Sequence, residues 1–306
     1  MKILVTGGAG FIGSNLVDTL VERNHNVVVI DNLSTGKKEF VNTKAKFFEI
    51  DITDQKVEEI FEQEKPEVVF HLAAQIDVRK SVEDPMTDAR VNILGSINIL
   101  ESARKSGVKK IVMSSTGGAI YGEVTDDLIP TKETCLARPI SPYGIAKLTI
   151  ENYLHYYHEI FGLNYVVLRY ANVYGPRQNS KGEAGVVAIF IDKILKNDSP
   201  VINGKGLQTR DYVFVDDVVC ANLLALDSEP IGTYNIGTRK ETNVNEIFQT
   251  IVKYSGSTVQ EIHAPAKIGE QTRSCLDYSL AQEKLDWQPE IELSEGIERT
   301  LEWFKK

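Results

Sequence analysis

The N-terminal half of the chain alternates short apolar runs with longer amphipathic segments. The runs have the length and continuous hydrophobicity of strands that are buried on both faces, and they lie at residues 3–5, 26–30, 47–50, 68–71 and 109–114. Apolar positions with helical spacing predict helices from the end of the first run to about residue 23, over 55–62 and over about 86–106. This alternation predicts an α/β fold with a doubly wound parallel (Rossmann) sheet, which binds ligands at the carboxyl ends of its strands.

The alternation becomes less regular after Ala171. A helix from Ser141 to Phe161 and a strand over 165–169 precede this point, and a short apolar segment over 234–237 predicts a strand that returns to the sheet. Further helices are expected near residues 244–254, 279–285 and 294–304. We therefore expect a first domain over residues 1–170, with a returning segment near 211–237. Residues 171–210 and 238–306 would form a smaller C-terminal α/β lobe.

Composition excludes several classes of protein. The net charge of −9 over 306 residues argues against nucleic acid as a partner, because no excess of basic residues is available for phosphates. The cysteines, at positions 135, 220 and 275, form neither a disulfide framework nor a zinc-ligand spacing, and no metal site is expected. No apolar run reaches the ~18 residues of a membrane span. The N-terminal run leads directly into a glycine-rich turn, unlike a signal peptide, so a cytoplasmic protein is expected.

A glycine-rich turn follows the first predicted strand and opens the first helix. Its glycines are Gly7, Gly10 and Gly13, and an acid, Asp31, ends the second strand. Glycines let a pyrophosphate approach the backbone at a helix N-terminus, and the acid accepts a hydrogen bond from the ribose 2′-hydroxyl. This combination favours NAD over NADP, because Asp31 would repel a 2′-phosphate. The alternative is a purely structural turn.

A second motif lies at the start of the helix over 141–161. Ser141 is a suitable N-cap and Pro142 a suitable first helical residue, which places Tyr143 and Lys147 on one helix face. A nearby ammonium lowers the pKa of a phenol, so the pair could move a proton to or from a hydroxyl. The alternative is an exposed helical turn. His71, at the end of a predicted strand, is interpreted as a packed histidine because no acid is placed to orient it.

These motifs resemble those of a known family. The chain is similar to the extended short-chain dehydrogenase/reductases of the NAD-dependent epimerase/dehydratase type, and most closely to the UDP-glucose (UDP-galactose) 4-epimerases. The segments that carry the resemblance are TGGAGFIG, DNLSTG, HLAAQ, SSTGGAIYGE, SPYGIAK, LRYANVYGPRQ and TRDYVFVDDV.

The resemblance implies an NAD-binding first domain and a lobe that binds a nucleotide sugar. Phe11 and Ile12 would lie under the pyrophosphate, and Tyr170 near the nicotinamide carboxamide. Residues expected around the adenosine, and then along the nicotinamide, are Asp31, Asn32, Ser34, Thr35, Gly36, Asp51 and Ile52, and Leu72, Ala73, Ala74 and Gln75. The substrate set comprises Thr116, Tyr143, Asn172, Val187, Arg210, Glu270 and Arg273. For Arg210 and Arg273, an ion pair on the surface or between the lobes is the alternative to a phosphate contact.

The resemblance also implies a reaction. Tyr143, supported by Lys147, would take the C4 hydroxyl proton while C4 gives hydride to NAD, and the 4-keto sugar would be reduced again from its other face. The hydroxyl that assists would come from Thr116, or from Ser115, because Thr116 replaces a serine of many relatives and one glycine is added. Gly117 and Gly118 follow where dehydratases and decarboxylases carry an acid, which leaves reduction as the available exit.

Several questions stay open at this point. The resemblance implies that the residue at position 274 limits the sugar pocket. Because Ser274 is small, it would leave space for an N-acetyl group, so UDP-GlcNAc and UDP-GalNAc are possible substrates beside UDP-glucose and UDP-galactose. Lys267 replaces an arginine of many epimerases and weakens the placement of one phosphate contact. Alternatives are a 4-epimerase of UDP-glucuronate or another nucleotide sugar, and a non-catalytic NAD(H)-binding sensor. The resemblance further implies a homodimer formed through the helices near 86–106 and 141–161.

Overall fold

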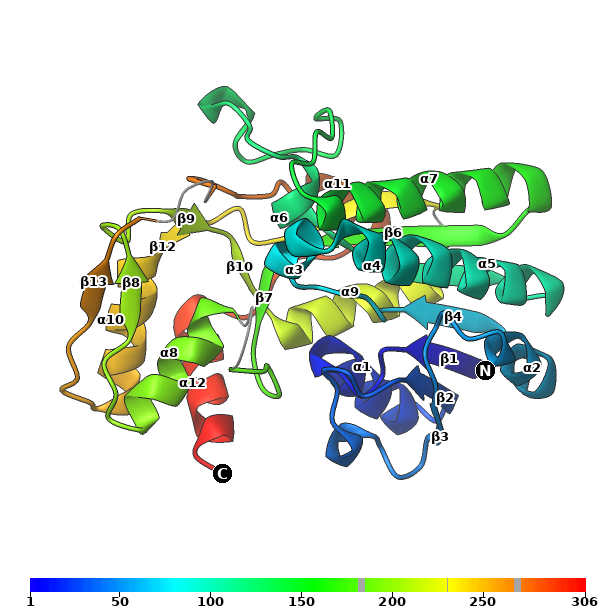
Figure 1. Ribbon diagram of the computed structural model, residues 1–306, viewed down its shortest axis with the longest axis horizontal. Helices are drawn as coiled ribbons and strands as arrows, with labels where there is room; N and C mark the ends of the chain where they lie inside the picture. The colour runs from blue at the N-terminus through cyan, green and yellow to red at the C-terminus, as the bar shows by residue number, and fades with distance from the viewer. Residues whose placement is uncertain (181–184, 230, 267–270) are drawn as a thin grey trace.

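A parallel seven-stranded sheet forms the centre of the larger of two lobes (Figure 1). The computed structural model describes residues 1–180, 185–229, 231–266 and 271–306. The strand order is β11-β6-β5-β4-β1-β2-β3, and every pairing in this sheet is parallel. The strands are β1 (Lys2–Thr6), β2 (Asn26–Asp31), β3 (Lys46–Glu49), β4 (Val68–His71), β5 (Lys110–Thr116), β6 (Asn164–Tyr170) and β11 (Gly232–Ile236). The predicted fold class is confirmed, and the returning strand is β11, which pairs with β6.

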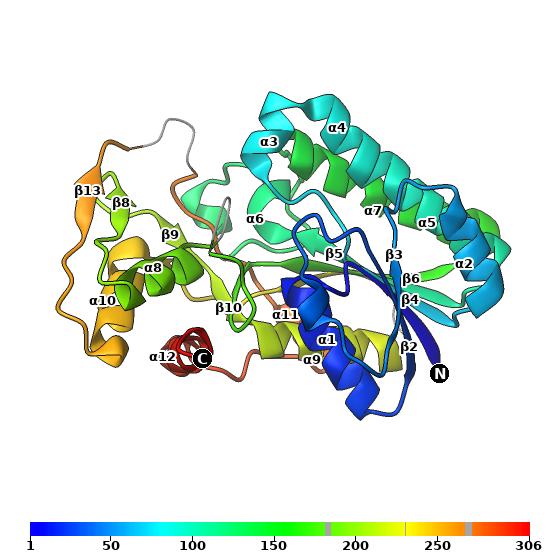
Figure 2. The same cartoon turned by 60° about the horizontal axis from the view of Figure 1, so that its bottom comes forward.

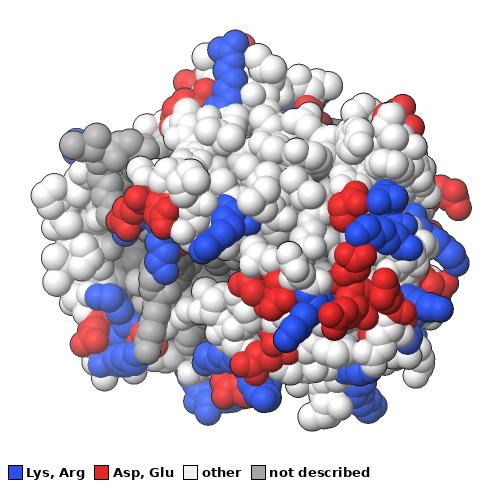
Figure 3. Space-filling view, turned by 45° about the vertical axis from the view of Figure 1, so that its right-hand side comes forward, with Lys and Arg blue, Asp and Glu red and all other residues white. Residues whose placement is uncertain are grey.

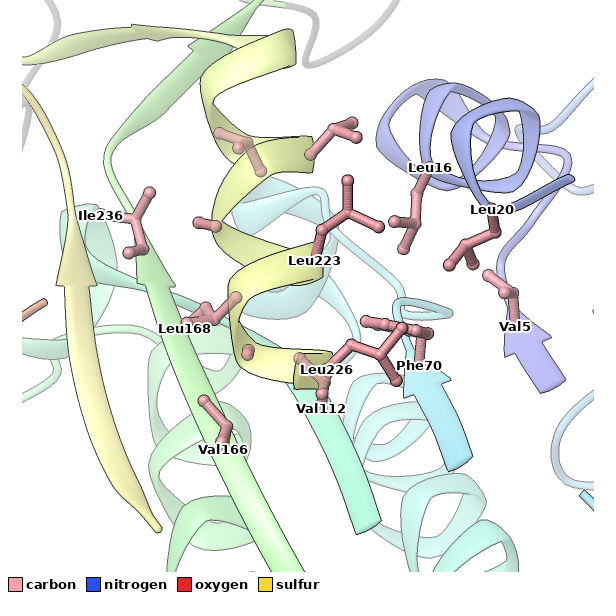
Figure 4. Close-up of a cluster of buried hydrophobic side chains, with 14 of the residues drawn as sticks. Val5, Leu16, Leu20, Phe70, Val112, Val166, Leu168, Leu223, Leu226 and Ile236 are labelled. Atoms are coloured by element: carbon pink, nitrogen blue, oxygen red, sulfur yellow. The ribbon is translucent and has the colours of Figure 1, made fainter. Parts of the chain in front are cut away.

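Helices cover both faces of this sheet, as in a doubly wound fold. One layer contains α1 (Phe11–Glu22), α9 (Val215–Asp227) and α11 (Ser279–Leu285). Figure 4 shows Leu16 and Leu20 of α1 opposite Leu223 of α9, and Leu226 of α9 beside the side chain of Phe70. The other layer contains α2 (Lys56–Glu64), α5 (Gly95–Lys105) and α7 (Pro142–Phe161), whose apolar faces form a second core with the strands.

The long helix that we predicted over residues 86–106 is divided into three parts. It consists of α4 (Pro85–Ala89), a π-helical turn (Arg90–Leu94) and α5, and it is preceded by α3 (Val78–Glu83). Asn92 lies in the π turn. Its Oδ1 accepts the Gln75 N–H at 2.8 Å, and its Nδ2 donates to the Gln75 carbonyl oxygen at 3.0 Å. The irregular turn therefore aims a polar side chain at the strand-end loop, as π turns at functional sites often do.

The smaller lobe packs around its own hydrophobic core (Figure 2). Its helices are α8 (Val186–Leu195), α10 (Val244–Ser255) and α12 (Leu293–Phe304). Short strands pair as β7 (Asn172–Tyr174) with β10 (Tyr212–Phe214), β8 (Val201–Asn203) with β13 (Ile262–Ala264), and β9 (Thr209–Arg210) with β12 (Thr242–Asn243). The helices over 244–254, 279–285 and 294–304 were predicted, whereas α8 was not. Within the described ranges, no helix combines the length and apolar character that a membrane span requires.

Candidate active site

The glycine turn joins β1 to α1 at the carboxyl edge of the sheet. Gly7 has φ of +72°, and a Cβ on Gly13 would lie 2.1 Å from the Gly7 carbonyl oxygen. A Cβ on Gly10 would meet only that same oxygen, at 3.2 Å, within 4 Å. Gly10 is also the N-cap of α1 and provides no side-chain cap, and no acid lies in the first turn. The helix N-terminus is thus free of negative side chains and open to an anion, which fits a dinucleotide pyrophosphate.

Acids at the ends of β2 and β3 lie beside this turn. Asp31 accepts hydrogen bonds from the backbone N–H groups of Ala9, at 3.0 Å, and Leu33, at 2.8 Å, which fixes its carboxylate next to the glycines. Asp51 accepts from Asn32 at 2.6 Å, and hydrogen bonds from Thr53 and Asn32 lower its pKa although burial opposes them. The structure therefore brings Asp31, Asn32 and Asp51 together at one corner.

The loops around this corner pack closely against the glycine turn. A Cβ on Gly36 would lie 2.9 Å from the backbone of Ala9, so the segment that carries Ser34 and Thr35 lies against the glycine turn. A Cβ on Gly7 would lie 2.7 Å from the backbone nitrogen of Ala73, which follows Leu72 after β4. Ile52 is buried against Gly95 at the start of α5, while Ala74 and Gln75 continue the loop after β4.

Tyr143 and Lys147 lie in the first turns of α7. The Oγ of Ser141 accepts the Gly144 N–H at 3.2 Å, and Pro142 is the first helical residue, as predicted. Lys147 donates from Nζ to the Ser114 carbonyl oxygen at 2.9 Å, and its Nζ lies 5.9 Å from the centre of the Tyr143 ring. Helix α7 thus ties both residues to the carboxyl end of β5.

The electrostatics of this pair differ from the prediction. Burial lowers the pKa of Lys147 to about 8, against the charges of Glu151 and Asp88, which raise it. Burial and the Asp88 carboxylate raise the pKa of Tyr143 above its usual value. The groups of the protein alone therefore do not produce the lowered phenol pKa that the Tyr-Lys spacing suggested, because burial and the Asp88 carboxylate both raise it.

Ser115 and Thr116, the two candidate hydroxyl groups, point to opposite faces at the end of β5, as successive strand residues do. Ser115 is buried and donates from Oγ to Oε1 of Glu151 at 2.6 Å. Thr116 accepts the Ala119 N–H at 3.2 Å and caps the short helix α6 (Gly117–Ile120). A Cβ built on Gly118 would lie 4.0 Å from Oγ1 of Thr116 and 3.8 Å from Oδ1 of Asn172, so these two side chains face one point.

The predicted substrate residues of the smaller lobe lie in different environments. Arg210 donates to the Thr209 carbonyl oxygen at 2.7 Å and makes no ion pair with the described residues. Arg273 is engaged by carboxylates: its Nε and Nη2 donate to Glu241 at 3.0 and 2.6 Å, and its Nη1 to Asp126. Val187 is buried in the core of this lobe. Glu270 and Lys267 lie outside the described residues.

Two further predicted residues are buried. Ser274 is 7% exposed. Tyr170 directs its hydroxyl to Asn222 of α9, whose Nδ2 lies 2.8 Å away, and burial raises the pKa of this phenol. The side chain of Tyr170 is therefore held in the layer of α1 and α9, which leaves its backbone at the carboxyl end of β6.

His71 has the packed role that we predicted. Its Nδ1 lies 2.8 Å from Oγ1 of Thr6 and its Nε2 lies 2.8 Å from Oγ of Ser96. The ring is buried, and burial, with the charge of Lys147, lowers its pKa to about 3. A neutral imidazole between two hydroxyl groups satisfies both ring nitrogens.

Buried charged residues on α7, β6 and α4 were missed from the sequence. Glu151 and Arg169 form a bidentate pair, with Nε–Oε1 at 3.1 Å and Nη2–Oε2 at 2.5 Å. Asp88 of α4 is buried as well. Glu151 could have been found because it is one helical turn beyond Lys147, on the same face. Nothing in the local sequence distinguishes Asp88 from a solvated acid.

Together, the fold and the glycine turn, strand-end acids and Tyr-Lys pair define an NAD-dependent enzyme of the short-chain dehydrogenase type. The model of the NAD dependent epimerase/dehydratase family matches residues 3–237. The chain belongs to this family, and the predicted resemblance is confirmed.

Individual relatives are similar over nearly the whole chain. A protein of Methanocaldococcus jannaschii named putative UDP-glucose 4-epimerase is 51% identical over 303 residues, which cover 99% of this chain and 98% of the relative. The solved UDP-glucose 4-epimerase of Thermotoga maritima, in a structure with UDP-glucose, superposes with a TM-score of 0.98 at 51% identity and covers 100% of this chain and 99% of its own. The UDP-glucose 4-epimerase of Thermus thermophilus, in complex with NAD, has a TM-score of 0.95 at 44% identity, with coverage of 100% and 99%.

Proposed function

We propose that this protein interconverts UDP-glucose and UDP-galactose by NAD-dependent epimerisation at C4 of the sugar. One observation carries the proposal: Lys147 is bonded to the carboxyl end of β5, Tyr143 precedes it by one turn of α7, and Thr116 and Asn172 face one point at the same end of β5. The glycine turn lies at the same edge of the same sheet. The high similarity to proteins named UDP-glucose 4-epimerase supports the choice of substrate.

NAD fits the residues at this edge. The open first turn of α1 would receive the pyrophosphate, Asp31 the adenosine ribose, and the loop from Leu72 to Gln75 the nicotinamide side. When bound, NAD would accept a hydride from C4 of the sugar and would add a positive charge to the site. The carboxylate of Asp31, next to the glycines, disfavours a 2′-phosphate and so selects against NADP.

The chain's own residues would move the proton and hold the sugar. Tyr143 takes the proton of the C4 hydroxyl as a C–H bond at C4 is broken, and it returns the proton after the 4-keto sugar has presented its other face. Lys147 stabilises the phenolate, and Thr116 donates a hydrogen bond to O4. Because protein groups raise the pKa of Tyr143, the phenolate forms efficiently only when positive charge is added nearby.

The diphosphate would be held by residues at the junction of the lobes. Arg210 has donors available for it, and Asn172 faces the same opening as Thr116. Arg273 reaches phosphate only by leaving Glu241 and Asp126, so we assign it the secondary role. Glu270 remains the proposed partner of the uridine ribose. The small Ser274 supports a second activity on UDP-GlcNAc and UDP-GalNAc, and turnover on UDP-galactose with none on the N-acetyl pair would remove that extension.

A UDP-sugar panel, tested without added cofactor and followed by product separation, tests the main proposal. UDP-galactose should yield UDP-glucose, and Tyr143→Phe should lower turnover by at least ~100-fold while NAD still copurifies. Tyr153→Phe, which alters an exposed tyrosine of the same helix, is the matched control and should leave turnover unchanged. If UDP-glucuronate alone were turned over, the protein would be a UDP-glucuronate 4-epimerase instead. No turnover in the unaltered protein, with NAD bound, would favour the sensor.

We further propose a homodimer through α4, the π turn and α7. Exposed apolar side chains on these elements include Met86 (79% exposed), Leu94 (60%), Ile145 (51%) and Ile160 (62%). Figure 3 shows a broad area without charged side chains on one face, beside groups of Lys, Arg, Asp and Glu. Such a patch is typical of a subunit interface. Sedimentation equilibrium should give twice the chain mass, and a monomer would contradict the dimer. The three free cysteines support a reducing compartment, the cytoplasm.

A further inference from the structure

Asp88 is a buried carboxylate that the mechanism above does not use. It belongs to α4, which packs beside α7 (Figure 1), and only 2% of the residue is exposed. Its Oδ1 accepts hydrogen bonds from Nε2 of Gln75 at 3.0 Å and from Nδ2 of Asn92 at 2.9 Å. Burial raises the pKa of Asp88, whereas the hydrogen bonds from these two N–H donors and the charge of Lys147 favour its ionised form. Gln75 in turn belongs to the loop proposed to line the nicotinamide.

Of the two carboxylates that act on Lys147, one is paired with an arginine and the other has no such partner among the described residues. The charges of Glu151, on its own helix, and of Asp88, on α4, act on Lys147. Its Nζ lies 5.9 Å from the centre of the Tyr143 ring, and its own charge acts on the buried, neutral ring of His71 at the end of β4. The carboxylate of Glu151 is bound on both oxygens by Arg169. Asp88 forms no ion pair with any described lysine or arginine, so its negative charge is left for the Tyr143–Lys147 region.

This charge acts on both members of the catalytic pair. Glu151 and Asp88 raise the pKa of Lys147 against the larger opposing effect of burial, which leaves it at about 8. Asp88 also raises the pKa of Tyr143. A lysine that lost its proton would no longer stabilise a phenolate. The pKa of Lys147 lies only a little above neutral pH, so any loss of nearby negative charge should bring this pKa closer to neutral.

We propose that Asp88 is a positioning residue for the Tyr143–Lys147 pair: its carboxylate, anchored by Gln75 and Asn92, keeps Lys147 protonated and sets the pH range of turnover. The inference rests on the proposed function. It predicts a specific signature, because removal of the charge moves the acid and alkaline limbs of the pH–rate profile in the same direction, to lower pH. A residue with a merely structural role would lower activity without moving either limb.

Asp88→Asn is the test variant, because its Oδ1 can accept from both amide donors while the charge is gone. Asp88→Glu restores the charge, and Glu83→Gln removes an exposed charge from the neighbouring α3 as a matched control. The first measurement is kcat against pH with saturating UDP-galactose. The second is the NMR titration of the Lys147 Cε resonance in protein labelled with ¹³C-lysine, assigned by comparison with Lys147→Met.

In Asp88→Asn, both limbs and the Lys147 titration should move down by about 1 pH unit, whereas Asp88→Glu and Glu83→Gln should match the unaltered protein. Unchanged limbs and an unchanged Lys147 titration, in an Asp88→Asn protein with normal circular dichroism, would overturn the proposal. The NMR titration requires no turnover. A protein that fails on every UDP-sugar therefore refutes the proposed function, and the role of Asp88 is still decided by the resonance.

Discussion

Ser115 and Thr116 provide a direct test of how the end of β5 is used. The hydroxyl of Ser115 is buried and donates to the Glu151 carboxylate at 2.6 Å. A hydrogen bond to a charged group contributes about 1.5–3 kcal/mol, and Arg169 continues to hold both oxygens of Glu151 after its loss. Ser115→Ala should therefore lower the free energy of unfolding by that amount and leave the rate of turnover within about twofold.

Thr116 should show the opposite behaviour. Its Oγ1 lies beside the opening that it shares with Asn172, and it caps only the four-residue helix α6. In Thr116→Ala, loss of that cap should cost about 1 kcal/mol of unfolding free energy. Loss of a hydrogen bond that strengthens in the transition state should lower kcat about 100-fold. Thr116→Ser keeps the hydroxyl and should retain most of both properties.

Urea unfolding and the turnover of UDP-galactose, measured on the same preparations, separate these effects. The reasoning fails if Ser115→Ala loses turnover as severely as Thr116→Ala while its unfolding free energy is unchanged. That result would mean that the Ser115 hydroxyl leaves Glu151 during the reaction.

Two further predictions concern stability. Gly13→Ala should destabilise the fold by about 1–3 kcal/mol and abolish retention of NAD, because its Cβ would lie 2.1 Å from the Gly7 carbonyl oxygen. Gly118→Ala is the control: its Cβ meets nothing closer than 3.8 Å, so this variant should unfold like the unaltered protein. Equal unfolding of the two variants in urea would contradict the prediction. His71 has a folded-state pKa of about 3, below its unfolded value, so its contribution is present above ~6.5 and is lost as the pH falls towards 3. Between pH 7 and pH 5 this loss amounts to about 2 kcal/mol, and His71→Asn should show a correspondingly weaker dependence in urea unfolding at the two pH values.

Several parts of the fold follow from local sequence alone. Strands β1, β2 and β4 are continuous apolar runs because both of their faces are buried, and the start of α7 is fixed by its Ser141 cap and by Pro142. Gly7 has a positive φ, and Gly13 lies too close to the Gly7 carbonyl oxygen for a side chain to fit. By contrast, strands of two or three residues, such as β9 and β12, contain too few positions for a periodicity to be visible.

The candidate site divides in the same way. The sequence by itself identified the residues that we propose for the chemistry, since Tyr143, Lys147 and Asp31 stand at fixed positions relative to a helix start or a strand end. Only the tertiary structure decided their surroundings: that Ser115 faces Glu151, that Arg273 is engaged by Glu241, and that burial raises the pKa of Tyr143. Spacing along one element fixes which side chains are neighbours, whereas desolvation and charge depend on what other elements bring against them. Asp88 arrives from a different helix, so no local pattern could reveal its effect on the pair.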